Sequence, residues 1–144
     1  MDYRDYAKDL LARKKNLVSA YSAIKCELEA LEQEKIACKT AIANAESSNG
    51  KTLYDERLIN ILADLDDCRF RRSVVERELI KIEKGMNGLN EYQRDLLDAF
   101  FVEEEQGTAE DLMIKWFKER SSLYRDRSKA LDAFTRSIYG VLQL

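Results

Sequence analysis

The sequence predicts an all-α protein, in which a long antiparallel, coiled-coil-like helical hairpin is followed by a small C-terminal helix-turn-helix domain. Three observations carry this prediction. The 144 residues include no proline and only five glycines, so few residues interrupt helices. Apolar residues recur with heptad spacing over the first 88 residues and with shorter helical runs afterwards. The alternation of apolar and polar residues that indicates strands is missing over any useful length.

The first predicted helix starts near residue 3 and continues for about 45 residues. One set of apolar residues returns at every seventh position: Tyr3, Leu10, Leu17, Ile24, Leu31, Cys38 and Ala45. A second set lies four residues later, where Lys14 and Lys35 interrupt it: Ala7, Tyr21, Leu28 and Ile42. This spacing is typical of a helix that packs along a partner helix.

A turn at residues 47–51 is expected to end this helix. Asn49 and Gly50 tolerate left-handed backbone angles, and Thr52 followed by Asp55 resembles a capping box that starts a new helix. The second helix has a cleaner seam with one polar member: Leu58, Ile61, Leu65, Cys68, Arg72, Val75, Leu79, Ile82, Met86 and Leu89. Two long helices joined by so short a turn fold back antiparallel.

Gly85 and Gly88 lie close together where the second seam ends. We interpret this pair as a hinge or linker, because glycine weakens a helix interior. The hinge predicts two domains: a helical arm of residues 1–88 and a helix-turn-helix domain of residues 89–144.

Three shorter helices are predicted after the hinge. Asn90 followed by Gln93 indicates a capping box at the start of the first, which continues to Phe101. Thr108 followed by Asp111 indicates the start of the second, of about 11 residues.

Ser121 or Ser122 is expected to cap the third helix, and Gly140 to end it. A short helix, a tight turn and a second helix with basic residues in its first turns form the layout of a helix-turn-helix. In that motif the second helix enters the major groove of DNA.

The charge distribution supports this interpretation, although the whole chain has a net charge of −3. Seven basic and three acidic residues lie between positions 115 and 136. DNA binding needs a local basic face, not a basic whole. We therefore predict a binding site for double-stranded DNA that consists of eight residues: Lys115, Lys118, Arg120, Ser122, Tyr124, Arg125, Ser128 and Lys129.

The predicted roles follow from side-chain chemistry. Arg125 can bond guanine through two hydrogen bonds, and serine and tyrosine hydroxyls can bond phosphates or base edges. Lys115, Lys118 and Arg120 can neutralise backbone phosphates. Spacing alone leaves the alternative open that these residues form an ordinary solvated face on a helical pair.

Composition argues against several other classes of protein. Histidine is absent, and the three cysteines form no CxxC pair, so we expect no metal site and no cofactor. No glycine-rich phosphate loop and no cysteine beside a base is present, so we expect no catalytic residues and no enzyme. The N-terminus is charged and no apolar run reaches about 20 residues, which predicts a cytoplasmic protein without a membrane partner.

A run of residues in the third short helix resembles a known family. Ser122 is followed by Tyr124-Arg125, by Lys129-Ala130-Leu131 and by a terminal Tyr139-Gly140. About the last 55 residues resemble region four of bacterial sigma factors and, more closely, the ArpU/RinA-type regulators of phages and Gram-positive genomes. The chain departs from many relatives in having no glycine in the turn at 118–121 and an acidic preceding helix.

The resemblance implies a DNA-binding regulator that activates phage or prophage genes together with RNA polymerase. A coiled-coil adaptor, or a phage structural component without DNA binding, is the alternative from a different class. The sequence also leaves open whether the hairpin packs on its own C-terminal domain or pairs with a second chain in a homodimer.

Overall fold

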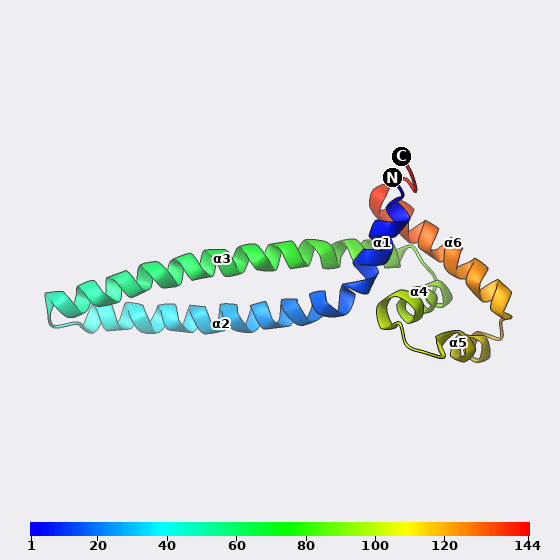
Figure 1. The fold of residues 1–144 in the computed structure, drawn as a ribbon. Helices are drawn as coiled ribbons and strands as arrows, with labels where there is room; N and C mark the ends of the chain where they lie inside the picture. The colour runs from blue at the N-terminus through cyan, green and yellow to red at the C-terminus, as the bar shows by residue number, and fades with distance from the viewer. The chain divides into compact units, whose positions relative to one another are not determined.

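The computed structural model describes residues 1–144 and is all-helical, which confirms the predicted fold class (Figure 1). A single isolated bridge between Asp2 and Gln143 is the only β-type pairing. The helical elements follow one another in the order α1 (Tyr3–Ala12), α2 (Lys14–Asn44), α3 (Ser48–Asn87), α4 (Glu91–Leu97), the π-helical η1 (Asp98–Glu103), α5 (Thr108–Trp116) and α6 (Arg120–Tyr139). None of these helices is both long and apolar enough to cross a membrane.

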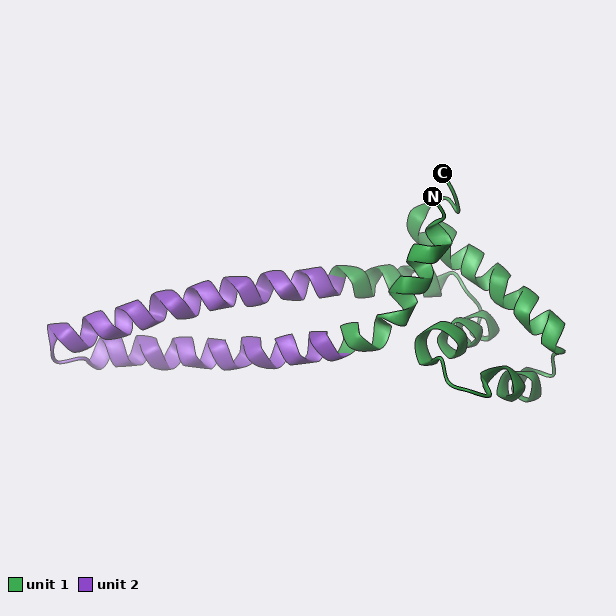
Figure 2. Cartoon of the chain, viewed as in Figure 1, with its two compact units in different colours: residues 1–18, 77–144 green, residues 19–76 purple.

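Two compact units make up the chain, as Figure 2 shows. One unit is Ser19–Glu76, and the other joins Met1–Val18 to Arg77–Leu144. This division differs from a boundary at residue 88, because both ends of the predicted arm pack with the C-terminal helices. Their shared core consists of Ala7, Leu10, Leu11, Ile82, Met86, Leu89, Leu97, Ala130, Leu131 and Phe134.

The unit Ser19–Glu76 is an antiparallel hairpin formed by parts of α2 and α3, as the heptad seams predict. Cys38, Ile61 and Leu65 are buried in its core, and Leu28, Leu31, Ile42 and Leu58 pack around them. Arg72 is the one polar residue of the α3 seam. It is half-buried, and its Nε has no hydrogen-bond partner.

The turn of this hairpin is tighter than predicted. The helix α3 already begins at Ser48, where the hydroxyl of Ser47 accepts a hydrogen bond from the backbone N–H of Gly50 at 3.2 Å. Thr52 therefore lies inside α3 and donates its hydroxyl to the carbonyl of Ser48 at 2.9 Å. The prediction of a helix start at Thr52 was wrong because the helix starts one turn earlier, where the Ser47 hydroxyl satisfies the free backbone N–H of Gly50.

The predicted continuous first helix is interrupted at Arg13, between α1 and α2. Asp2 begins α1 by accepting a hydrogen bond from the backbone N–H of Arg4 at 2.9 Å. Leu10 and Leu11 are adjacent in sequence and both fully buried. A straight helix on a single partner cannot bury two successive residues so completely, since they point about 100° apart. The interruption lets α1 pack into the core that α6 provides.

Gly88 lies in the short segment between α3 and α4, where the hinge or linker was predicted, whereas Gly85 has a different role. Gly85 lies inside α3 and is buried. A Cβ atom at this position would lie 2.5 Å from Cδ2 and Cε2 of Phe134, so glycine is required there by the close approach of α6. The sequence signal was the same for both roles, because a helix–helix contact and a flexible joint both favour glycine.

The starts of the three C-terminal helices agree unequally with their predictions. The capping box at α4 is confirmed, since Asn90 Oδ1 accepts from the N–H of Gln93 at 2.8 Å and Gln93 Oε1 accepts from the N–H of Asn90 at 3.1 Å. Gly107, with φ of 79°, precedes α5, so Thr108 is its first residue and not its cap. Similarly, α6 begins at Arg120, before the serines predicted to cap it.

Candidate nucleic-acid interface

The helices α5 and α6 are joined by a three-residue turn at 117–119, the layout predicted for a helix-turn-helix. Phe117 adopts a left-handed conformation (φ 53°, ψ 48°) that ends α5 and redirects the chain. A small core holds α4, α5 and α6 together through Leu96, Ala109, Leu112 and Leu123. Because this core fixes the turn and the start of α6, it also fixes where the side chains on the outer face of α6 lie.

The outer face of α6 carries three basic side chains that form no ion pair with a carboxylate. Arg125, Lys129 and Arg136 are all exposed, and none forms an ion pair within 4.0 Å. They recur at intervals of four and seven residues, which places them on one side of the helix. At 1.5 Å per residue the three span about 16 Å along the axis. We call these three residues the basic stripe.

Two acidic residues of α6 are already engaged with other helices. The Asp126 carboxylate accepts a hydrogen bond from the Tyr92 hydroxyl at 2.8 Å, and Asp132 pairs with Arg4 at 3.4 Å. Burial, followed by the hydrogen bond to Asp126, raises the pKa of Tyr92 to about 12, so this hydroxyl remains a donor at neutral pH. Asp132 lies on the side of the basic stripe, three residues after Lys129, and its pairing with Arg4 partly offsets its charge. Asp126 keeps its full charge, because its partner is a neutral hydroxyl.

Lys115 and Arg120, which were predicted to contact phosphates, form ion pairs inside the protein. The Lys115 ammonium lies 2.8 Å from Asp95, whose carboxylate also accepts a hydrogen bond from the Trp116 indole at 2.7 Å. The hydrogen bond to Asp95 raises the pKa of Lys115. Arg120 pairs with Glu110 across the turn.

Asp95 remains ionised because its partners outweigh its burial. Desolvation raises the pKa of this carboxyl, but the hydrogen bonds from Lys115 and Trp116 together lower it by more than desolvation raises it. The pKa therefore lies below its ordinary value. The ion pair of Lys115 is exposed on the lysine side, and such pairs contribute little to stability. A phosphate could therefore replace Asp95 as the ion-pair partner of Lys115 at a small cost in stability.

The other predicted site residues lie around the turn and along α6. The Lys118 ammonium stands 5.4 Å from the centre of the Tyr92 ring, and Ser122 is half-buried. Tyr124 packs on Phe100 with ring centres 5.6 Å apart, and the exposed Ser128 donates its hydroxyl to the Tyr124 carbonyl at 3.2 Å.

The structure thus divides the eight predicted residues into two groups. Arg125, Ser128 and Lys129 lie exposed on one side of α6. Ser122 shares that side but is half-buried, and the other four lie elsewhere on that helix, on α5 or in the turn.

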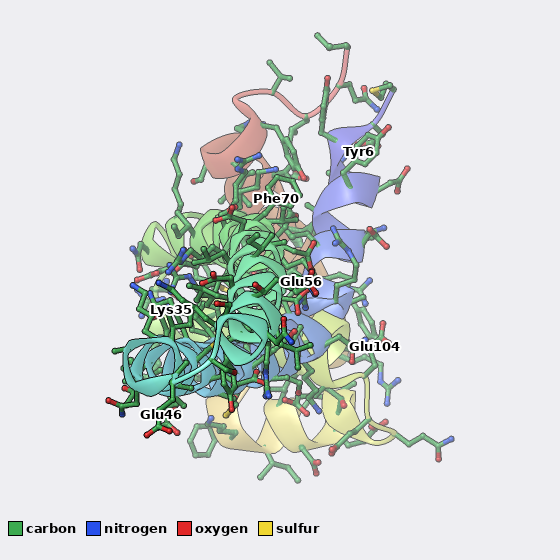
Figure 3. The ribbon with its side chains drawn as sticks, turned by 90° about the vertical axis from the view of Figure 1, so that its left-hand side faces the viewer. Tyr6, Lys35, Glu46, Glu56, Phe70 and Glu104 are labelled. Carbon is green, nitrogen blue, oxygen red and sulfur yellow. The ribbon has the colours of Figure 1, made fainter.

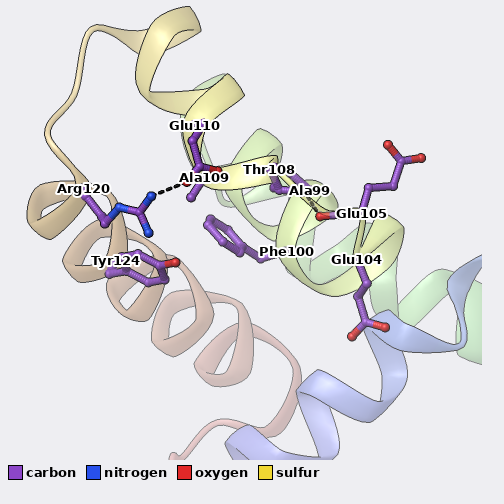
Figure 4. A pocket seen from close by; sticks show the side chains of 10 residues that line it. Ala99, Phe100, Glu104, Glu105, Thr108, Ala109, Glu110, Arg120 and Tyr124 are labelled. Atoms are coloured by element: carbon purple, nitrogen blue, oxygen red, sulfur yellow. Dashed lines mark hydrogen bonds and ion pairs between the residues drawn. The ribbon is translucent and has the colours of Figure 1, made fainter.

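A cavity of about 400 Å³ opens beside this region, between the start of α5 and α6 (Figure 4). Arg120 and Tyr124 line one side of it, and Glu104, Glu105 and Glu110 line the other. Three carboxylates against one guanidinium make the cavity a poor place for a phosphate. DNA contact on this unit is therefore better supported by the basic stripe than by the cavity.

Sequence reasoning missed two residues of this region. Arg136 belongs to the basic stripe but was not assigned to the site, although its spacing of seven residues from Lys129 places it on the same helical face. Phe117 was also missed: its side chain is 94% exposed, and no pattern in the sequence marks it as the left-handed residue of the turn. No group of three or more histidine, cysteine, aspartate or glutamate residues is arranged to hold a metal ion.

Comparisons of this chain with protein-family models, with curated proteins and with solved structures found no match.

Proposed function

We propose that this protein is a DNA-binding transcription regulator that contacts double-stranded DNA through the outer face of α6. The basic stripe of Arg125, Lys129 and Arg136 is the observation that carries the proposal. It provides three exposed cations that form no ion pair, on one side of the second helix of a helix-turn-helix layout. Phosphate contacts would position the helix, and contacts to base edges would select the site.

The eight predicted residues all belong to the proposed site, but we expect them to contribute unequally to DNA binding. Arg125, Ser128 and Lys129 would face the DNA directly, and Ser122 and Lys118 would lie at its edge. Lys115 and Arg120 would contact phosphates only by leaving Asp95 and Glu110, so they would contribute less. Tyr124 would act mainly by supporting the helix through Phe100.

The resemblance to ArpU/RinA-type regulators extends the proposal to a phage or prophage activator that works with RNA polymerase. One structural feature suits a polymerase contact. Residues 103–105 are three consecutive exposed glutamates at the end of η1, and only Glu103 has an ion pair, with Lys15. Basic surfaces of a protein partner would be attracted to them.

Immunoprecipitation of the tagged protein from cells, followed by DNA sequencing, tests this function. A regulator should enrich a small set of promoter-proximal sites, and an Arg125→Ala/Lys129→Ala variant expressed to the same level should lose them. A protein that enriches no site while it recovers protein partners would instead be the coiled-coil adaptor.

A further inference from the structure

The helix α3 has a second apolar face that α2 does not cover. The inner seam packs on α2, while Ile59, Phe70 and Val74 point the other way and are 66%, 67% and 43% exposed. Figure 3 looks along the hairpin from its turn, with Glu56 and Phe70 labelled on α3 and Lys35 on α2. Helices that are apolar on two opposite faces are normally buried on both. We call residues 56, 59, 63, 70, 74 and 77 the outer face of α3.

The outer face of α3 is complementary to the same face of a second, antiparallel copy. For two antiparallel copies of α3 whose midpoint lies between residues 66 and 67, each residue meets the one equally far from that midpoint in the other copy. Ile59 then faces Val74, and the large Phe70 faces the small Ala63. Each pair occurs twice, as a two-fold axis requires.

The charges at the ends of this face match in the same register. Glu56 faces Arg77 of the other copy, and within a single chain both side chains are exposed without an ion pair. By contrast, the neighbouring Arg69 and Arg71 are held by Glu32 and Glu27 on α2, at 2.6 and 2.9 Å. Glu56 and Arg77 are the two charged residues of the outer face, and the register brings them together.

Asp66 and Asp67 lie at the midpoint, where like charges from the two copies would approach each other. Both carboxylates already have partners on their own helix: Asp66 lies 3.8 Å from Arg69, and Asp67 lies 2.9 Å from Arg71. These pairs reduce the repulsion at the centre, and the apolar contacts on both sides of it provide the attraction.

We propose that a second copy of this chain docks antiparallel on the outer face of α3 and forms a two-fold homodimer in this register. The order of large and small side chains along this face, and the order of its charges, are both complementary to the same face read in reverse. A two-fold interface between identical chains requires this complementarity, whereas an interface with an unrelated partner does not. The proposal does not depend on DNA binding, since the basic stripe lies on a different helix.

Sedimentation equilibrium of the full chain, with monomers of 16.7 kDa, tests the proposal at concentrations up to about 100 μM. We expect a dimer for the wild type and a monomer for Ile59→Glu. The matched control is Ile36→Glu, because Ile36 is 62% exposed on α2, against 66% for Ile59. The control should remain dimeric, and circular dichroism should show both variants to be helical. A monomeric wild type, or a dimer that survives Ile59→Glu, overturns the proposal.

Charge reversal tests the register itself. Glu56→Arg alone and Arg77→Glu alone each place like charges together twice per dimer, so each should weaken dimerisation by about tenfold. The double variant Glu56→Arg/Arg77→Glu restores opposite charges and should regain the wild-type dissociation constant. Additive weakening in the double variant would place the interface in a different register and overturn the proposal.

Discussion

Phe134 of α6 packs directly on the backbone of Gly85 in α3. The contact is so close that a Cβ atom on residue 85 would lie 2.5 Å from two ring carbons of Phe134 and 3.0 Å from Ile138 Cδ1. Phe134 is fully buried in the core that also contains Leu10, Leu11 and Ile82. This contact anchors the C-terminal half of α6, the helix that carries the basic stripe.

Gly85→Ala should lower the free energy of unfolding by about 1–3 kcal/mol, because the added methyl group overpacks a filled core. Equilibrium unfolding in urea, followed by circular dichroism, measures the change. Gly88→Ala is the matched control: its Cβ would meet only Ser137 Oγ, at the ordinary distance of 3.5 Å. Equal stability of Gly85→Ala and wild type would show that Phe134 does not pack as described.

Trp116 is the only tryptophan, so its fluorescence reports on its hydrogen bond to Asp95. The fold holds the pKa of Asp95 below its ordinary value. The ionised carboxylate therefore stabilises the folded state fully at any pH above that ordinary pKa. This contribution is lost as the pH falls through the lower, folded-state pKa. We expect a fluorescence transition with a midpoint below about 3.9, the ordinary pKa of aspartate.

Asp95→Asn should abolish this acid transition, while Asp111→Asn, at an exposed carboxylate on α5 without an ion pair, should keep it. Circular dichroism recorded in parallel separates the local event from global acid unfolding. A transition that persists in Asp95→Asn would assign it to another group.

Phe117 combines a left-handed backbone with a side chain that is 94% exposed. Phe117→Gly should stabilise the protein by about 0.5–1 kcal/mol, since glycine adopts φ near 53° without the strain of a Cβ atom. Phe117→Ala keeps the strain and removes almost no buried surface, so its melting temperature should stay near that of the wild type. Destabilisation by both substitutions would instead reveal a packing role for the ring.

The long helices of the fold could be predicted because they depend on an apolar pattern that repeats along the sequence. The seam containing Ile61, Leu65 and Cys68 repeats an apolar residue every three or four positions, and those three residues are buried in the structure. The capping box of Asn90 and Gln93 was also predictable, since both partners lie within four residues of each other.

Local features that depend on distant residues could not be predicted. The role of Gly85 depends on Phe134, which is 49 positions away, and the interruption at Arg13 depends on the core that α6 supplies. At the candidate site, the charges of Lys115 and Arg120 could be counted from the sequence, but their pairing with Asp95 and Glu110 could not. Arg136 is different, because the helical period alone places it on the same face as Lys129, and it could therefore be predicted from the sequence.

Fluorescence anisotropy of a labelled DNA duplex, titrated at salt concentrations from about 50 to 200 mM, tests the central claim most directly. The wild type should bind with an affinity that falls steeply as salt rises. The triple variant Arg125→Ala/Lys129→Ala/Arg136→Ala should bind more weakly, and its slope of log K against log salt should be smaller by about 2.7, because each phosphate that the protein no longer neutralises lowers the slope by about 0.9. The control Lys25→Ala/Lys39→Ala/Lys51→Ala removes three exposed, unpaired charges from the hairpin and should keep the wild-type slope. Absence of salt-dependent binding by the wild type, or equal slopes for the two triple variants, would contradict DNA recognition by α6.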